Sequence, residues 1–160
     1  MESCTLIIDG GTVGSNPGIG VAAVVVKDAD GQIVHSENEA LGAGMSNNQA
    51  EYRALLLGIA AARRLGAKKV EVLCDSRLVV SQVNKEWAIH NLGLRGLARE
   101  VWEQVKGFEE FTLKWVPRAE VAEADELLNA VRPHADMGNG PEPTFREWLR
   151  RPDGQWFHLP

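Results

Sequence analysis

Residues 5–39, TLIIDGGTVGSNPGIGVAAVVVKDADGQIVHSENE, decide the fold of this 160-residue chain. Residues 5–8 and 20–26 are short runs of mostly apolar or β-branched side chains, which are typical of buried strands. The first run ends at Asp9-Gly10-Gly11, where we expect a turn, and Asp30-Gly31 predicts a tight hairpin into a third strand over 32–39. The chain is therefore predicted to open with three antiparallel strands.

The rest of the chain alternates predicted helices and strands. After a predicted loop at 42–44, apolar residues recur at helical spacing from Gln49, with Asn47-Asn48 as the cap and Gly66 at the end. Similar patterns predict a strand over 69–74, helices over 77–84 and 92–105, a strand over 111–116 and a helix over 121–131. This order predicts an α/β fold: a five-stranded mixed sheet, with an antiparallel meander and then parallel strands, flanked by helices on both faces.

The composition changes after residue 131. Five of the seven prolines fall in the last 28 residues, so 132–160 is predicted to be a loop-rich, Pro/Gly-rich extension and not a second domain. The extension also carries large apolar side chains at Trp148, Leu149, Trp156 and Phe157. We therefore expect it to pack on the single domain formed by residues 1–131.

Charge and cysteine content limit the classes of function. With 17 basic and 22 acidic residues the net charge is −5, which argues against a surface that attracts phosphate backbones everywhere. Cys4 and Cys74 belong to no zinc pattern and are expected to be reduced and buried. No apolar run reaches the roughly 18–20 residues needed to cross a bilayer, and we expect no secretory signal segment. We expect a cytoplasmic monomer without a membrane partner.

Four acidic residues stand where α/β sheets bind ligands. Asp9 and Asp75 each follow an apolar strand, and the ends of neighbouring strands meet at one edge of a sheet. Glu51 and Asp125 lie near helix starts, where acids also have an ordinary role in capping. If the four carboxylates meet, their mutual repulsion requires a bound cation. Ligands that are all oxygen favour Mg²⁺ or Mn²⁺ over Zn²⁺.

Five sequence blocks follow one another along the chain: Ile8-Asp9-Gly10-Gly11 with Asn16-Pro17-Gly18, residues 46–55, residues 75–80, residues 87–91, and Trp115-Val116-Pro117-Arg118 with residues 123–130. In this order they resemble the type 1 ribonuclease H family over about residues 3–131. The resemblance implies the ribonuclease H-like fold. It also implies an endoribonuclease that hydrolyses the RNA strand of RNA/DNA hybrids.

The resemblance places the family's functional residues on this chain. The four catalytic carboxylates map onto Asp9, Glu51, Asp75 and Asp125, which would hold two Mg²⁺ ions, or Mn²⁺ in their place, for two-metal-ion catalysis. By resemblance Asp9 bridges the ions, Asp125 holds the ion that activates water, and Glu51 and Asp75 hold the other. The contacts to the hybrid duplex map onto Gly10, Gly11, Asn16, Ser46, Asn47, Asn48, Trp87 and Asn91.

Not all of these contact residues need touch the substrate. Ser46 and Asn91 resemble a pocket for a phosphate of the DNA strand. Asn47 and Asn48 can instead serve only as helix caps, and Trp87 can instead anchor its helix.

Two features depart from the family's pattern. Many relatives have a His in the loop before the last catalytic Asp, whereas residues 117–121 contain none, so this chain resembles the branch without that His. We expect activity with an altered dependence on pH or metal. Between Lys85 and Arg99 the only basic residues are Lys85, Arg95 and Arg99, so binding of the hybrid should be modest.

Three other functions fit the same fold. The first is a non-catalytic nucleic-acid-binding domain, although a degenerate copy should have lost at least one of the four acids. The second is another nuclease, but a 3′–5′ exonuclease would require an acidic residue at position 11, which is Gly11 in this chain. The third is a relative that also cuts double-stranded RNA.

Overall fold

The computed structural model describes the backbone of residues 1–138, 144–150 and 156–158 and the side chains of residues 1–130. Its elements in chain order are β1 (Ser3–Val13), β2 (Gly18–Lys27), β3 (Ile33–Met45), α1 (Asn47–Arg64), β4 (Lys69–Cys74), α2 (Arg77–Val83), α3 (Leu92–Val105), β5 (Glu110–Trp115), the short 3₁₀ helix η1 (Arg118–Val121), α4 (Ala122–Gly138), β6 (Thr144–Arg150) and β7 (Trp156–His158).

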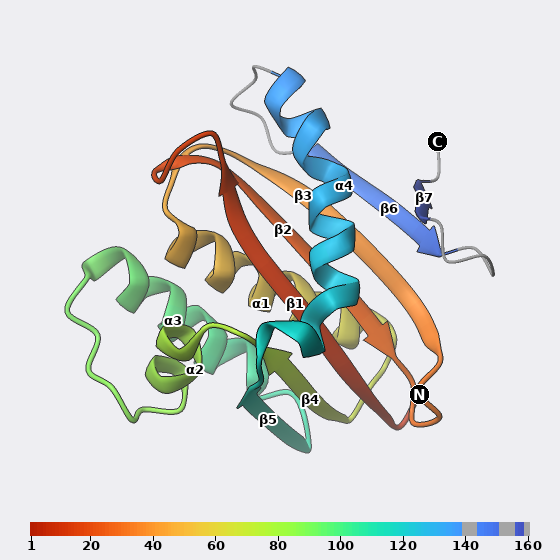
Figure 1. The fold of residues 1–160 in the computed structure, drawn as a ribbon. Coiled ribbons are helices and arrows are strands. Elements are labelled where there is room, and N and C mark those ends of the chain that lie inside the picture. Colours follow the sequence, from red (N-terminus) through yellow and green to blue (C-terminus); the bar gives the residue numbers. More distant parts are fainter. Residues whose placement is uncertain (139–143, 151–155, 159–160) are drawn as a thin grey trace.

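The strands form one mixed sheet in the order β5-β4-β1-β2-β3-β6-β7. Strands β1, β2 and β3 pair antiparallel, whereas β4 runs parallel to both β1 and β5. The predicted five-stranded mixed sheet is therefore confirmed, and β6 and β7 extend it beyond β3. Figure 1 shows α1 and α4 on opposite faces of the sheet, as the order of elements predicts. No helix in the described part of the chain has the length and apolar character to span a membrane.

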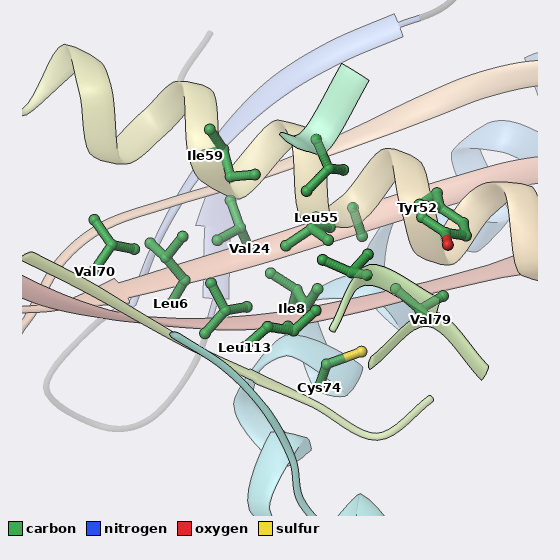
Figure 2. Close-up of a cluster of buried hydrophobic side chains, with 14 of the residues drawn as sticks. Leu6, Ile8, Val24, Tyr52, Leu55, Ile59, Val70, Cys74, Val79 and Leu113 are labelled. Atoms are coloured by element: carbon green, nitrogen blue, oxygen red, sulfur yellow. The ribbon is translucent and has the colours of Figure 1, made fainter. Parts of the chain in front are cut away.

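Alternation along β1 assigns each side chain to one of two cores. Leu6 and Ile8 are fully buried on the α1 face, where Leu55 packs above them (Figure 2). Ile7 points the opposite way, into the core that contains Leu127 of α4. Since neighbouring residues of a strand face opposite sides, position 9 belongs to the α4 face and position 10 to the α1 face. This alternation decides which face of the sheet each functional residue of β1 reaches.

Two predicted turns are wrong. β1 continues through Asp9-Gly10-Gly11 to Val13 because β2 pairs with it over this whole stretch, up to the partners Val13 and Ile19. The predicted loop at 42–44 lies inside β3, which runs to Met45. Gly42 and Gly44 have φ of 97° and 73°, so their glycine signal reflects irregular strand geometry and not a chain reversal.

The C-terminal extension contains more regular structure than its prolines predict. Helix α4 runs on to Gly138, and β6 pairs antiparallel with β3 from Glu37 opposite Glu147 to Ala40 opposite Thr144. β7 then pairs with β6. The proline-free segments 144–150 and 156–158 are thus strands. The composition of the whole extension, averaged over its prolines and glycines, did not predict them. The expected packing of its apolar side chains lies outside the described residues.

Candidate active site

Asp9 and Asp75 meet where two parallel strands separate. The ladder between β1 and β4 ends at Ile7 opposite Leu73, and β4 itself ends at Cys74. Asp75 follows β4 directly, whereas Asp9 lies inside β1, just beyond this ladder, and not at the end of a strand as predicted. Both carboxylates nevertheless reach the same edge, and the charge of Asp75 acts on Asp9.

Glu51 reaches this edge because α1 lies unusually close to β1. A Cβ atom at Gly10 would stand 2.4 Å from the carbonyl oxygen of Ala50 and 2.7 Å from the backbone nitrogen of Glu51. Only a residue without a side chain permits that approach. Gly10 therefore has a packing function, apart from any contact with substrate: it lets the N-terminal part of α1 place Glu51 beside Asp9.

Asp125 comes from the opposite face of the sheet. Asp9 points toward α4, as the parity of β1 requires, and its carboxyl group interacts there with that of Asp125. The Asp125 carboxylate also accepts hydrogen bonds from Arg118 Nη2 at 3.0 Å and from Asn129 Nδ2 at 3.5 Å. The structure thus brings together all four predicted carboxylates, Asp9, Glu51, Asp75 and Asp125, hereafter the acidic cluster.

Burial and mutual repulsion disfavour the charged forms of this cluster. Desolvation, the hydrogen bond to Asp125 and the charge of Asp75 raise the pKa of Asp9 to about 8. Desolvation first, and then the charges of Asp9 and Asp75, raise the pKa of Glu51 well above its ordinary value, while a backbone hydrogen bond from Gly10 lowers it. Desolvation also raises the pKa of Asp75, which Arg118 opposes. A bound divalent cation would favour the charged carboxylates and so offset their desolvation and mutual repulsion.

The donor atoms fit such a cation. Asp9 is 3% exposed, and Asp9 Oδ2 and Glu51 Oε2 are buried without a hydrogen-bond donor among the described residues. Buried polar oxygens normally have partners, so these two are uncommitted. One oxygen of Glu51 and one of Asp75 also lie within 4.8 Å of each other. Carboxylate oxygens in this arrangement are suited to Mg²⁺ or Mn²⁺.

Arg118 belongs to this site, although sequence reasoning did not assign it a role. Its guanidinium bonds to Asp125, and the charges of Asp125, Asp9 and Asp75 raise its pKa. It lies in the loop that lacks the family's His, directly after Pro117. The sequence held one signal for this role. Arg118 lies in the block that follows β5, seven positions before Asp125, and a basic side chain there can contact the Asp125 carboxylate.

A cavity of about 400 Å³ opens beside the cluster. Of the predicted substrate contacts, Gly10, Gly11 and Asn47 line it, together with Asp9, Glu51 and Arg118. Asn16 supports this wall because its Oδ1 accepts a hydrogen bond from the Asn47 backbone N–H at 3.0 Å. The predicted contact Asn48 is exposed at the start of α1 and does not line the cavity.

Ser46 and Asn91 are helix caps on neighbouring helices. Ser46, and not Asn47 or Asn48 as predicted, is the N-cap of α1: its Oγ accepts from the Gln49 N–H at 3.1 Å. Asn91 Oδ1 caps α3 through the Leu94 N–H at 3.0 Å. A Cβ at Gly93 would lie 3.2 Å from Asn91 Oδ1 and 3.7 Å from Gln49 Nε2. The N-termini of both helices therefore face one region, as a phosphate pocket requires.

Trp87 stands apart from the acidic cluster. It lies in the loop between α2 and α3 and is 51% exposed, so about half of its surface is free to contact a substrate. It lines a separate cavity of about 530 Å³ with the three basic residues of this region, Lys85, Arg95 and Arg99.

Comparisons with known proteins agree with this geometry. A protein-family profile described as "Reverse transcriptase-like" matches residues 8–131. The chain is 38% identical over 121 residues to a bifunctional protein of Mycobacterium tuberculosis, covering 76% of this chain and 33% of that protein. It is 36% identical over 121 residues to ribonuclease HI of Halobacterium salinarum, covering 76% of this chain and 60% of the relative. The chain thus spans less than two thirds of either curated relative.

Three solved structures share the fold. The N-terminal ribonuclease H domain of the M. tuberculosis protein, solved as a fusion with maltose-binding protein, has a TM-score of 0.81 and 33% identity and covers 88% of this chain and 100% of that chain. Ribonuclease H1 of H. salinarum has a TM-score of 0.78 and 32% identity, with 82% and 98% covered. LC11-RNase H1, from compost, was solved with an RNA/DNA hybrid; its TM-score is 0.77 and its identity 28%, with 82% and 98% covered.

The order β3-β2-β1-β4-β5, with helices on both faces, is therefore the ribonuclease H fold. With 32–33% identity over nearly the whole of two solved relatives, the chain belongs to the type 1 ribonuclease H family.

Proposed function

We propose that this protein is an endoribonuclease that hydrolyses the RNA strand of RNA/DNA hybrids with two bound divalent ions. The observation that carries the proposal is the acidic cluster, in which four carboxylates from β1, α1, α4 and the end of β4 converge and two buried oxygens have no donor among the described residues. Like charges held this close are unfavourable without cations, so the arrangement supports a metal-dependent function over a purely structural one.

Each carboxylate has a distinct place in the proposed mechanism. Asp9 has the smallest exposed fraction of the four and interacts with Asp125, Asp75 and Glu51, so it would contact both ions. Asp125 would hold the ion on the attacking side, and Glu51 and Asp75 the ion on the leaving side. When bound, two Mg²⁺ or Mn²⁺ ions would polarise the attacking water and neutralise the charge that develops on the leaving oxygen.

Other residues would orient the substrate. The cavity wall formed by Gly10, Gly11 and Asn47, with Asn16 behind it, is suited to contact the 2′-hydroxyl groups that distinguish RNA from DNA. The N-termini of α1 and α3 at Ser46 and Asn91 would bind a phosphate of the DNA strand, since backbone N–H groups point outward there. Trp87, exposed and near three basic side chains, would pack against the DNA strand further along.

The comparisons support this choice over the alternatives. A structural relative, LC11-RNase H1, was solved with an RNA/DNA hybrid. A non-catalytic copy would not need to retain four mutually repelling carboxylates at an unfavourable cost. Cleavage of double-stranded RNA remains the second candidate, because the A-form helix of such a duplex also presents 2′-hydroxyls.

The decisive experiment compares three labelled duplexes, RNA/DNA, RNA/RNA and DNA/DNA, each incubated with the protein in Mg²⁺ and in EDTA. We expect internal cleavage of the RNA strand of the hybrid in Mg²⁺ alone. Cleavage that continues in EDTA would contradict the metal-dependent mechanism. Equal cleavage of RNA/RNA would favour the second candidate, and cleavage of DNA/DNA would contradict the proposed specificity.

A further inference from the structure

The thiol of Cys74 lies directly beneath the acidic cluster. Cys74 is the last residue of β4 and shares the parity of Val70 and Val72, so its side chain enters the core on the α1 face, where it is fully buried (Figure 2). Its Sγ, one carboxylate oxygen of Glu51 and one of Asp75 all lie within 4.8 Å of one another. The other described cysteine, Cys4, is buried near the opposite end of the sheet, opposite Val70.

The spacing of these three atoms suits a small cation. Three atoms no more than 4.8 Å apart all lie within about 2.8 Å of a common centre, by the geometry of a triangle. Zinc–sulfur and zinc–oxygen bonds measure about 2.3 Å and 2.0–2.2 Å. Inward movements of less than about 1 Å would therefore complete such a site, a distance that rotation of the Glu51 and Asp75 side chains can supply.

Two of these donor atoms have little other hydrogen bonding. Glu51 Oε2 is buried with no hydrogen-bond donor among the described residues, and Sγ of Cys74 accepts a long contact from the Ser76 N–H at 3.5 Å. Asp9 faces the other side of the sheet, but its charge acts on Glu51, and its buried Oδ2 also has no donor among the described residues. The negative charge near Glu51 is therefore not balanced by a described hydrogen-bond donor at these two oxygens.

We propose that Cys74, Glu51 and Asp75 form a mixed sulfur–oxygen site for soft divalent cations, of which Zn²⁺ and Cd²⁺ are the simplest, and that occupation of this site blocks the enzyme. Soft cations take thiolate ligands, whereas Mg²⁺ is restricted to oxygen. When the metal–sulfur bond forms, the thiol proton passes to the buffer and no electron is transferred. Binding needs only the geometry of this site, and its inhibitory consequence rests on the proposed function.

The test uses Cd²⁺ with the metal-free full chain, kept reduced by a phosphine so that no added thiol competes. We expect the ultraviolet sulfur-to-cadmium charge-transfer absorption to grow to one equivalent. The matched control is Cys4→Ser, which should give the same band. Cys74→Ser should lose the band and bind Cd²⁺ more than about tenfold more weakly, since even outer-shell changes typically cost 10–100-fold in metal affinity.

Several results would overturn the proposal. These are no charge-transfer band in the wild-type chain, a band that Cys74→Ser retains, or a band that Cys4→Ser removes. If Cys74→Ser fails to fold, which circular dichroism would reveal, the titration of Cys4→Ser decides the case, because Cys74 is the remaining thiol in that variant. Glu51→Gln, with the thiol intact, should also weaken Cd²⁺ binding, and unchanged affinity would remove Glu51 from the site.

The inhibitory consequence has its own measurement. Zn²⁺ added against a fixed Mg²⁺ concentration should stop cleavage of the hybrid by the wild-type chain, and Cys74→Ser should need at least about tenfold more Zn²⁺. Equal inhibition of both chains would contradict the inhibitory part of the proposal. A chain that shows the cadmium band but never cleaves a hybrid would contradict the proposed function and leave the metal site standing.

Discussion

Replacing Asp9 by Asn should stabilise the metal-free protein at neutral and alkaline pH. Asp9 is 3% exposed, and desolvation with the neighbouring carboxyls raises its pKa from an ordinary 3.8 to about 8. Between these two values the folded chain binds more protons than the unfolded chain, so the free energy of unfolding falls as pH rises. The penalty is absent below about pH 4 and complete above about pH 8. An amide at position 9 carries no such penalty.

The size of the effect follows from the same values. Each pH unit within this window costs about 1.36 kcal/mol, which gives an upper limit of about 4 kcal/mol at pH 7. Water that enters the cleft beside Asp9 will reduce this figure. Mg²⁺ should return the lost stability to the wild-type chain, by about 2.7 kcal/mol at a concentration of 100 Kd, and should do less for Asp9→Asn.

Urea unfolding followed by circular dichroism tests this reasoning across pH, in EDTA and in Mg²⁺. Asp30→Asn is the matched control, because Asp30 lies in an exposed turn and its substitution should leave the pH profile unchanged. We expect the difference between Asp9→Asn and the wild-type chain to widen from about pH 5 to about pH 8 in EDTA. If Asp9→Asn is less stable than the wild-type chain throughout this range, the electrostatic reasoning is wrong.

Three further substitutions probe the supports of the acidic cluster. Gly10→Ala should destabilise the fold by about 1–3 kcal/mol and slow cleavage, because the new Cβ would stand 2.4 Å from the helix backbone. The control Gly96→Ala, with open space around the new Cβ, should gain up to about 1 kcal/mol of stability. Equal urea midpoints for the two variants would refute this prediction. Trp115→Phe removes the indole N–H that donates to the Asp75 backbone carbonyl at 3.1 Å. We expect a loss of about 1 kcal/mol in the free energy of urea unfolding and a lower cleavage rate. An unchanged rate would show that this hydrogen bond does not position Asp75. Arg118→Ala should change stability by less than about 1 kcal/mol, since the Arg118 side chain is 71% exposed. It should also lower the Mg²⁺ concentration for half-maximal binding, measured by calorimetry, because a competing positive charge is gone. Weaker Mg²⁺ binding would contradict this.

The order of elements was predictable because apolar periodicity is strong in the buried strands and in the helices that cover them. The ends of strands were less predictable. Nothing local at Asp9-Gly10-Gly11 shows that β2 continues to pair with it, so the glycines suggested a turn. The strands at 144–150 and 156–158 were not predicted for the same reason. The first pairs with β3, far away in the sequence, and the second pairs with the first, and such pairing overrides a proline-rich composition.

The four carboxylates were predictable because strand-end acids and a sequence resemblance pointed to the same positions. The supports of the cluster were not. The need for Gly10 depends on how closely α1 approaches β1, and the position of Arg118 depends on the path of η1 between β5 and α4. Ser46 took the capping role predicted for its neighbours because it is the residue with extended backbone before the first turn.

The cleavage rate of Asp75→Asn on an RNA/DNA hybrid at saturating Mg²⁺ tests the central claim most directly, with Asp30→Asn measured beside it. Asp75 is only partly buried, so its amide variant should fold, and circular dichroism can verify this. We expect Asp75→Asn to lose nearly all cleavage and Asp30→Asn to cleave like the wild-type chain. A folded Asp75→Asn that cleaves the hybrid at the wild-type rate would contradict the claim that these converging carboxylates form the catalytic centre.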